Sequence, residues 1–372
     1  MINQIPAAAE GRQPRAIIKL NGVAVDGWIN WEVQNNSFYQ ADTFSVSFAA
    51  SLLSNAYSVD WFSAQTVIAV EIFAGFPINV DSFTQAELTS LIYGNVDSVS
   101  YNPVNTIIEL SGRDLTYKLI DEKTTQKYAN QTSSEIATSI AKAHGLTPIV
   151  TKTSVRSGTY YQIDHARLND SNSDWDLLTY LANEEGYRVY VKGQSLYFEP
   201  DTSATAEPYI LHWQSPTQDN AYPVFNGVSV DFSRNLNIAK GSVVTVRSWN
   251  SKQKKAFTTS YPTKSAKGIA PGKASAPAQV YSYTIAGLSP EQALQRAQTL
   301  YKNIVQHEMK IQVSLPADNI LMPTSVIKFE GSNTSFDQLY YPESVTRSMS
   351  IDEGYMMTIS AKNHSPENDP LI

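Results

Sequence analysis

The sequence contains no cysteine. A disulfide framework, a thiolate metal site and a cysteine nucleophile are therefore excluded. Charged residues make up only 17% of the 372 residues, where globular proteins usually have about a quarter. Disordered chains combine many charges with few aromatic residues, whereas this chain has 21 Tyr and 13 Phe. The composition therefore indicates a folded protein with large buried or shared surfaces.

Long apolar runs and targeting signals are also missing. No window approaches the roughly 18 apolar residues of a membrane-spanning helix. The first 15 residues lack the basic stretch and apolar core of a secretory signal. We therefore expect synthesis in the cytoplasm and no membrane partner. The formal net charge of −7 argues against nucleic-acid binding as a main task.

No motif for catalysis, metal binding or phosphate binding is complete. The acids from Asp170 to Asp176 alternate as in a calcium loop, but Trp175 and Leu181 stand where Gly and Glu are required. Residues 268–273 resemble a phosphate loop with one residue too few between the glycines. The five histidines stand alone, and no G-x-S-x-G elbow is present. We expect no enzymatic activity, no cofactor and no metal.

Residues 1–113 contain six or seven strand-like segments and no long helix. Asn21-Gly22 between two apolar runs is a strong hairpin signal, and residues 44–48 alternate cleanly between apolar and polar. Many short strands without helices are typical of a closed or nearly closed antiparallel β unit. We therefore predict a β-barrel domain over residues 1–113.

Helix signals begin after residue 113. Thr132 and Glu135 have capping-box spacing, and so do Ser173 and Asp176. Gly145 and Gly186 are placed to end these two helices. Residues 160–163 and 187–198 are strand-like. We predict an α/β insert over residues 114–204.

The rest of the chain, 205–372, is again rich in strands. Ser289 followed by Pro290 predicts the start of a helix near 290–305. Residues 97–111 and 343–360 share the order of a Ser-Val strand, a turn and an apolar strand, which hints at duplication. The predicted fold class is therefore mainly β with an α+β insert, in which two antiparallel β-barrels flank the mixed region.

Positive charge is concentrated in one stretch. Between Phe232 and Pro290 there are nine bases and no acid. A solvated loop whose lysines discourage aggregation is one interpretation. An electrostatic contact with an acidic neighbour, such as another copy of the chain, is a second, and a phosphate-binding groove is a third.

Three ordered stretches resemble the baseplate hub proteins of phage tails. They are SGRD (111–114) with QTSSEIA (131–137) and HGL (144–146), then DWDLL (174–178) with EEG (184–186), and then GSVVTV (241–246) with Trp249 and the lysines after it. This family includes the late control protein D type, the Mu-like hub and the N-terminal part of the type VI secretion spike protein VgrG. The motif positions, taken as structural or interface residues, are Gly112, Arg113, Asp114, Thr132, Glu135, Trp175, Trp249, Lys252, Lys254 and Lys255.

The resemblance implies a virion structural protein of the tail baseplate, made late in the host cytoplasm. Such hubs have two tail-tube-like barrels per chain and form a homotrimeric ring. The ring joins the six-fold tail tube to the three-fold central spike and lets DNA pass without specific binding. The implied partners are the spike, a tail tube or distal tail protein, other baseplate proteins and the tape measure protein. The alternative is a tail-associated carbohydrate-binding or cell-wall-degrading protein.

Overall fold

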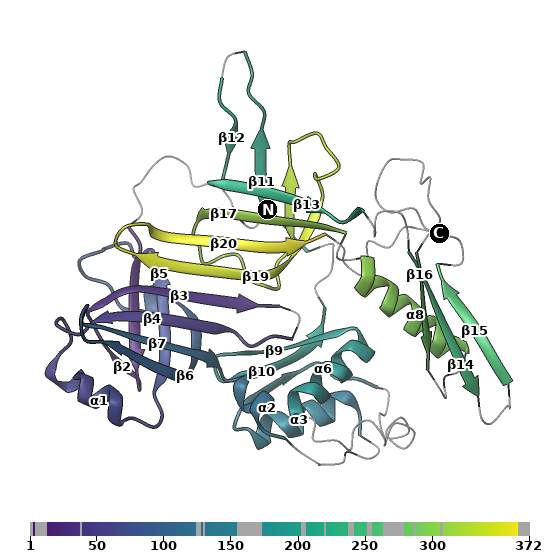
Figure 1. The fold of residues 1–372 in the computed structure, drawn as a ribbon, viewed down its shortest axis with the longest axis horizontal. Helices are drawn as coiled ribbons and strands as arrows, with labels where there is room; N and C mark the ends of the chain where they lie inside the picture. Colours follow the sequence, from purple (N-terminus) through teal and green to yellow (C-terminus); the bar gives the residue numbers. More distant parts are fainter. Residues whose placement is uncertain are drawn as a thin grey trace.

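The computed structural model describes residues 3, 13–37, 39–123, 128, 131–154, 173–201, 206–218, 221–236, 242–250, 255–262, 279–285, 288, 290–305 and 308–363. Fourteen of its strands form one sheet, called here the large sheet (Figure 1). Its strands are β1 (Arg15–Leu20), β2 (Val23–Ala24), β3 (Trp28–Asn36), β4 (Thr43–Ala49), β5 (Ala69–Gly75), β6 (Thr89–Asn102), β7 (Ile107–Asp114), β11 (Tyr209–Gln214), β12 (Val224–Phe225), β13 (Ser229–Arg234), β17 (Met309–Pro316), β18 (Ile327–Glu330), β19 (Leu339–Ser350) and β20 (Gly354–Lys362).

The large sheet joins the two β-rich ends of the chain. β3, from the N-terminal part, pairs with β19, from the C-terminal part, with Val33 opposite Arg347. Residues of both parts, such as Trp31 and Tyr355, fill one common hydrophobic core. The mainly β fold class with an α+β part is therefore confirmed. In the described part of the chain, however, the two β units are not separate closed barrels, because the β3–β19 pairing merges their sheets and their cores.

The local signals of the N-terminal part lie where the sequence predicts them. β1 and β2 form a hairpin at Asn21-Gly22, both of which have positive φ. The short helix α1 (Val59–Ala64) begins at Ser58, whose side chain accepts from the backbone N–H of Trp61. Two single turns of 3₁₀-helix (Asn55–Tyr57 and Gln85–Glu87) complete this part.

A second group of elements, called here the α/β unit, has its own core below the large sheet in Figure 1. It consists of α2 (Tyr117–Asp121), α3 (Ser133–Ala143), β8 (Thr147–Val150), α6 (Asp174–Glu185), β9 (Tyr187–Lys192) and β10 (Ser195–Pro200). Both predicted capping boxes are present, and Gly186 ends α6 in the left-handed conformation. The strand predicted at 160–163 lies outside the described residues.

A third group, called here the α8 unit, packs helix α8 (Pro290–Val305) on a separate sheet of β15 (Lys255–Tyr261), β14 (Ser242–Asn250) and β16 (Gln279–Thr284). The helix predicted near 290–305 is confirmed. Ala293, Ala297 and Tyr301 bury one face of it against Val244 and Val246. The domain boundaries at residues 113 and 204 stay predictions.

Gly112 gives a test of packing in the large sheet. A Cβ at this position would stand 2.1 Å from the backbone oxygen of Asn95 and 2.7 Å from Cζ of Phe44. Because a backbone atom cannot move aside as a side-chain tip can, we expect Gly112→Ala to destabilise the chain by about 1–3 kcal/mol or more. Ser111→Ala changes an exposed neighbour and should cost less than about 0.5 kcal/mol. Equal denaturant midpoints for the two variants would contradict this packing.

Candidate functional site

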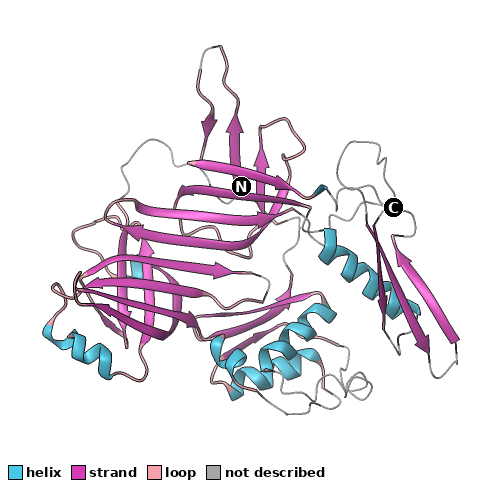
Figure 2. Cartoon of the chain, viewed as in Figure 1, coloured by secondary structure: helices cyan, strands magenta, loops and turns pink. Residues whose placement is uncertain are grey.

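Eight strands of the large sheet form a continuous run, called here the eight-strand run. Their order is β13–β17–β20–β19–β3–β4–β7–β6, and every neighbouring pair is antiparallel (Figure 2). Both ends of the run are open within the described residues. β13 pairs only with β17, and residues 98–102 of β6 pair only with β7 because the pairing with β5 ends at Asn95. Open edges carry unpaired N–H and C=O groups that can pair with another chain.

One face of the eight-strand run is rich in hydroxyl and amide side chains. Registered neighbours continue one another across the strands, as in the row Ser111, Ser45, Glu32 and Ser348. The same face carries Ser98, Ser100, Thr43, Gln34, Thr346, Thr358, Ser360, Gln312, Ser314, Ser229 and Ser233. The opposite side chains, such as Val46 and Ile359, are buried in the core. This polar face is therefore the uncovered side of the run.

Acids on the polar face are free, whereas its bases are paired. Glu32, Glu109 and Asp231 are exposed and form no ion pair within the described residues. Lys310 lies 2.8 Å from Glu343. Arg113 lies 2.7 Å from Asp97 and 2.9 Å from Asp121. The net effect of this pairing is a weakly acidic face.

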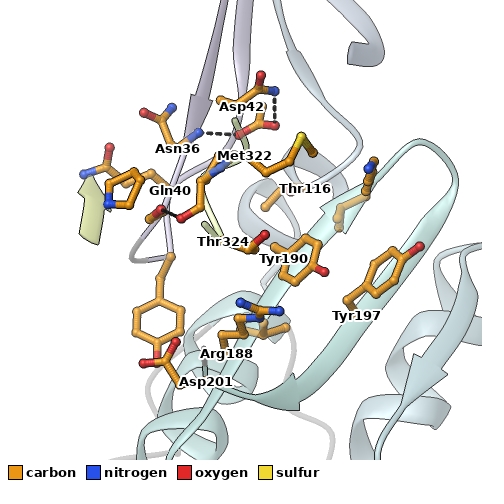
Figure 3. A pocket seen from close by; sticks show the side chains of 18 of the residues that line it. Asn36, Gln40, Asp42, Thr116, Arg188, Tyr190, Tyr197, Asp201, Met322 and Thr324 are labelled. Atoms are coloured by element: carbon orange, nitrogen blue, oxygen red, sulfur yellow. Dashed lines mark hydrogen bonds between the residues drawn. The ribbon is translucent and has the colours of Figure 1, made fainter. Parts of the chain in front are cut away.

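A groove of ≈ 1450 Å³ lies between the large sheet, the α/β unit and α8 (Figure 3). Its floor includes the uncovered side of β9 and β10, where the rings of Tyr190 and Tyr197 stack with centroids 4.8 Å apart. Glu199 accepts from Arg188 at 2.6 Å and from the Tyr190 hydroxyl at 3.0 Å. Burial, with the charge of Glu199 second, raises the pKa of Tyr190, so this phenol stays neutral.

A chain of buried polar groups crosses the sheet beside the groove. Nη1 of Arg347 donates to Oδ1 of Asn35 at 3.4 Å, and Nδ2 of Asn35 donates to Oδ2 of Asp42 at 2.8 Å. Arg347 is 1% exposed and also donates to the backbone oxygens of Asp318 and Leu321. Burial raises the pKa of Asp42 to about 6, although the hydrogen bonds from Asn36 and Asn35 lower it. These groups connect β19, β3 and β4.

Sequence reasoning missed Arg347 and Asp42. A signal existed for Arg347, because it alternates with Val345 and Met349 and therefore shares their inward face. For Asp42, which lies in a connection, the sequence offers no comparable pattern.

The predicted residues Gly112, Arg113 and Asp114 end β7. Gly112 allows close contact with Asn95, and Arg113 reaches the paired acids described above. Hydrogen bonds with Asp97 and then Asp121 raise the pKa of Arg113 further above its usual value. Asp114 is 4% exposed, and its carboxylate accepts from the backbone N–H of Thr116 and bonds the Thr116 hydroxyl at 2.8 Å.

Thr132, Glu135 and Trp175 shape the α/β unit. Thr132 and Glu135 form the capping box of α3. Trp175 is buried, and its Nε1 donates to the backbone oxygen of Tyr39 at 2.8 Å. Trp175 therefore ties α6 to the connection between β3 and β4.

Two of the remaining predicted residues, Trp249 and Lys255, belong to the α8 unit. Trp249 is 51% exposed near the end of β14. Lys255 begins β15, whereas Lys252 and Lys254 lie outside the described residues. Trp249 and Lys255 therefore lie in a different unit from Gly112, Arg113 and Asp114. Whether these ten residues act in an interface stays a prediction.

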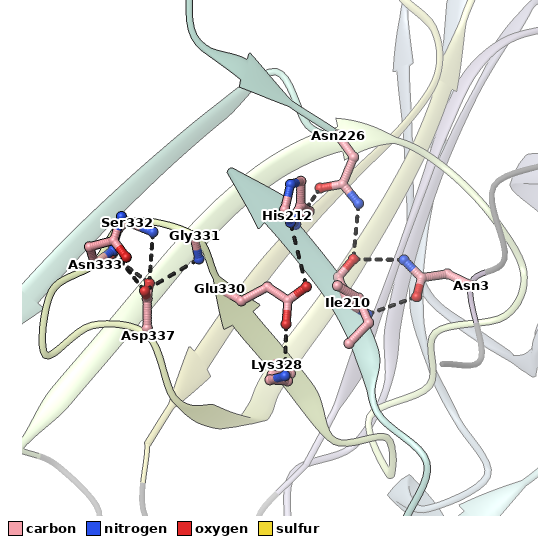
Figure 4. A network of polar contacts seen from close by, with 10 residues as sticks. All are labelled: Asn3, Ile210, His212, Asn226, Lys328, Glu330, Gly331, Ser332, Asn333 and Asp337. Atoms are coloured by element: carbon pink, nitrogen blue, oxygen red, sulfur yellow. Dashed lines mark hydrogen bonds and ion pairs between the residues drawn. The ribbon is translucent and has the colours of Figure 1, made fainter. Parts of the chain in front are cut away.

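The edge of β11 differs from the open edges of the eight-strand run. The side chain of Asn3 donates to the backbone oxygen of Ile210 and accepts from its N–H, each at 2.7 Å (Figure 4). Asn226 donates to the same oxygen and accepts from the N–H of His212. The Lys328 ammonium, through its hydrogen bond, lowers the pKa of the nearby Glu330. Side chains therefore occupy the backbone groups of this edge.

Two absences hold for the described part of the chain. It contains no group of three or more side chains suited to hold a metal ion. It also contains no helix that is long and apolar enough to cross a membrane.

Comparison with known proteins places this arrangement of strands among tail proteins. No protein-family model and no curated protein matches the sequence. A tail protein from Neisseria meningitidis MC58 matches with a TM-score of 0.65 and 13% identity, covering 94% of this chain and 97% of that one. The 43 kDa tail protein of prophage MuSo2 from Shewanella oneidensis matches with a TM-score of 0.65 and 14% identity, covering 95% and 99%.

The chain has the fold of phage tail proteins. A type VI secretion component from E. coli, itself similar in structure to the T4 tail proteins gp27 and gp5, also matches, with a TM-score of 0.52 and 13% identity. It is covered over 77% of its length and this chain over 94%. The resemblance to baseplate hub proteins drawn from the sequence is therefore confirmed at the level of the fold.

The Trp175 bond can be tested by removing its donor. Trp175→Phe keeps an aromatic ring but leaves the Tyr39 oxygen without its partner, so we expect a loss of about 1–3 kcal/mol of unfolding free energy. Trp249→Phe alters an exposed ring and should change stability by less than about 0.5 kcal/mol. Denaturant unfolding followed by circular dichroism measures both, and a larger loss for Trp249→Phe would contradict the assigned contact.

Proposed function

We propose that the chain is a structural hub of a phage tail baseplate, in which three copies form a ring between the tail tube and the central spike. The observation that carries this proposal is the eight-strand run with an open edge at each end. When the β13 edge of one copy pairs with the β6 edge of the next, the contact is head-to-tail, and such contacts close into rings. The fold shared with tail proteins supports the same role.

Each chain brings a run made of two four-stranded halves. One half consists of β13, β17, β20 and β19, and the other of β3, β4, β7 and β6. Three chains therefore present six similar halves, which suits a six-fold tube on one side and a three-fold spike on the other. The division into tube-like domains at 1–113 and 205–372, with an insert at 114–204, belongs to this proposal.

In this ring the polar face of the eight-strand run lines the bore. Hydroxyl and amide side chains offer hydrogen bonds that water replaces readily, and they give a passing phosphate chain no cationic contact. The free carboxylates of Glu32, Glu109 and Asp231 repel phosphate at distances within roughly 8–10 Å at physiological salt. DNA would therefore slide through without specific binding.

The α/β unit and the α8 unit contribute no strand to the eight-strand run. We assign them to contacts with the spike, the tail tube or distal tail protein, other baseplate proteins and the tape measure protein. The acid-free stretch 233–289, which includes the α8 unit's sheet, would meet an acidic neighbour outside the bore. The protein would be made in the host cytoplasm, become part of the virion tail, and act through assembly without catalysing a reaction.

Carbohydrate binding is the second candidate, favoured by the stacked Tyr190 and Tyr197 in the groove. The tryptophans argue against a glycan platform, because Trp31 and Trp175 are buried in different cores. Incubation with peptidoglycan or polysaccharide should give neither binding nor cleavage. Saturable binding that Tyr197→Ala abolishes would favour this candidate over the hub.

Light scattering of the purified chain tests the ring. We expect a particle of about 124 kDa, which is three times the chain mass of 41.2 kDa. If the chain alone is a monomer, the measurement is repeated with a candidate spike protein added. A chain that stays monomeric in both cases would contradict the hub.

Proline substitutions test which edge closes the ring. In a strand, the N–H groups of successive residues point to opposite sides, so one of Val99 and Ser100 directs its N–H to the open edge and the other to β7. We expect that one of the two variants, Val99→Pro or Ser100→Pro, melts like the wild type but no longer forms the trimer. In this variant proline removes the backbone N–H that points to the open edge. The other removes a bond with β7 and should lower the melting temperature. Trimers in both variants would exclude this edge from the contact.

A further inference from the structure

Two carboxyl groups lie together where the large sheet meets the α/β unit. Thr43 is opposite Arg113 in the pairing of β4 and β7, which sets Asp42 beside Asp114. The backbone N–H of Asp114 donates to the backbone oxygen of Asp42 at 2.9 Å. Asp114 is buried, and Asp42 lies half-buried on the groove wall, where Figure 3 shows it with Asn36 and Thr116.

Neither carboxyl group has a cationic partner in the described part of the chain. Asp42 accepts from Nδ2 of Asn35 at 2.8 Å and from the backbone N–H of Asn36 at 2.7 Å. Asp114 bonds only Thr116 through its side chain. Arg113, which directly precedes Asp114, points to Asp97 and Asp121 on the opposite face of the sheet.

Charged and titratable side chains of the neighbouring elements line the groove around the pair. Arg347 of β19 reaches Asp42 only through Asn35. Within the described residues, no other charged or titratable side chain of the groove wall bonds Asp42 or Asp114. These side chains are Tyr39, Glu71, Tyr93, Glu184, Glu185, Arg188, Tyr190, Lys192, Tyr197, Asp201, Tyr341, Glu343 and Lys362. Two like charges in such surroundings cannot both ionise without repelling each other.

We propose that Asp42 and Asp114 share a proton at neutral pH, and that its loss loosens the α/β unit from the large sheet. One chain connection into the α/β unit and one loop that contacts this unit start at the pair. Asp42 ends the connection that carries Tyr39, whose backbone oxygen accepts from Trp175 and whose hydroxyl lies 3.3 Å from the backbone oxygen of Tyr187. Asp114 leads directly to Leu115, which is buried in the core of the α/β unit. The pair therefore controls a hinge, independently of the proposed ring.

The pKa values have the direction that this mechanism requires. Burial raises the pKa of Asp42 to about 6, and burial together with the charge of Asp42 raises the pKa of Asp114 well above its usual value. An acid whose pKa is higher in the folded than in the unfolded state contributes its full stabilisation at pH values below the unfolded pKa of about 3.9. The stabilisation is lost as the pH rises through the folded pKa. Stability should therefore fall as the pH rises from 5 to 9.

Asp114→Asn tests the pair, because the amide cannot ionise and its oxygen can still accept from Thr116. Between pH 5 and pH 8.5 we expect the unfolding equilibrium constant of the wild type to rise by more than roughly 10-fold, because both carboxyl groups have raised pKa values in the folded state. In Asp114→Asn most of this rise should disappear. Asp121→Asn is the matched control, because hydrogen bonding to Arg113 lowers the pKa of Asp121, and this variant should keep the wild-type profile.

Hydrogen exchange shows whether the hinge itself responds. Amides of residues 115–121 and 174–185 should lose protection at pH 8.5 relative to those of β20, after correction for intrinsic exchange, and Asp114→Asn should restore it. If the variant does not fold, carbon NMR of labelled aspartates in the wild type replaces it, and one carboxyl should titrate above pH 6.

Three results would overturn the proposal. The first is a wild-type stability that does not change between pH 5 and 8.5. The second is an Asp121→Asn variant that flattens the profile as strongly as Asp114→Asn. The third is saturable stabilisation at pH 8.5 by calcium chloride and not by sodium chloride of equal ionic strength, because the pair would then be a cation site. None of these results depends on whether the chain forms a trimer.

Discussion

The pairing of β3 with β19 is the contact on which the rest of the molecule depends. Without it, the N-terminal and C-terminal strands would form two small sheets, each with an additional exposed edge. With it, Trp31 packs against Tyr355 with ring centroids 5.7 Å apart, and both halves share one core. The same pairing sets Val345 opposite Asn35, next to Arg347, so the polar groups that connect the halves are placed by the register of these two strands.

Polar contacts join segments that are far apart in the sequence. Arg347 satisfies two backbone oxygens of the loop after β17 as well as Asn35. Arg296 of α8 lies 2.7 Å from Glu184 of α6 and so connects the α8 unit to the α/β unit. Hydrogen-bonded and ionic contacts need specific geometry and lose more than apolar contacts when they are displaced. They therefore fix the relative orientation of the units, whereas the apolar cores stabilise each unit separately.

The sequence was sufficient wherever the controlling chemistry is local. Thr132 with Glu135 and Ser173 with Asp176 determined helix starts, and Asn21-Gly22 determined a hairpin, because each signal acts within a few residues. The joining of β3 to β19 could not be predicted, because more than 300 residues separate the partners and either strand could have ended a closed barrel. Asp114 follows Ile108, Leu110 and Gly112 on the inward face of β7, so its burial was readable, but its neighbour Asp42 was not.

The contrast between sheet edges gives the strongest physical argument for assembly. At β11, the side chains of Asn3 and Asn226 bond the backbone groups of Ile210 and His212 that no strand pairs. At residues 98–102 and at β13, no such side-chain bonds occur within the described residues, although these edges are at least as long. Unpaired backbone groups at an open edge of a weakly charged strand can pair with strands of other proteins and cause aggregation, unless a specific partner covers the edge. In the proposed ring, the two edges at opposite ends of one run would cover each other, because the copies join head to tail.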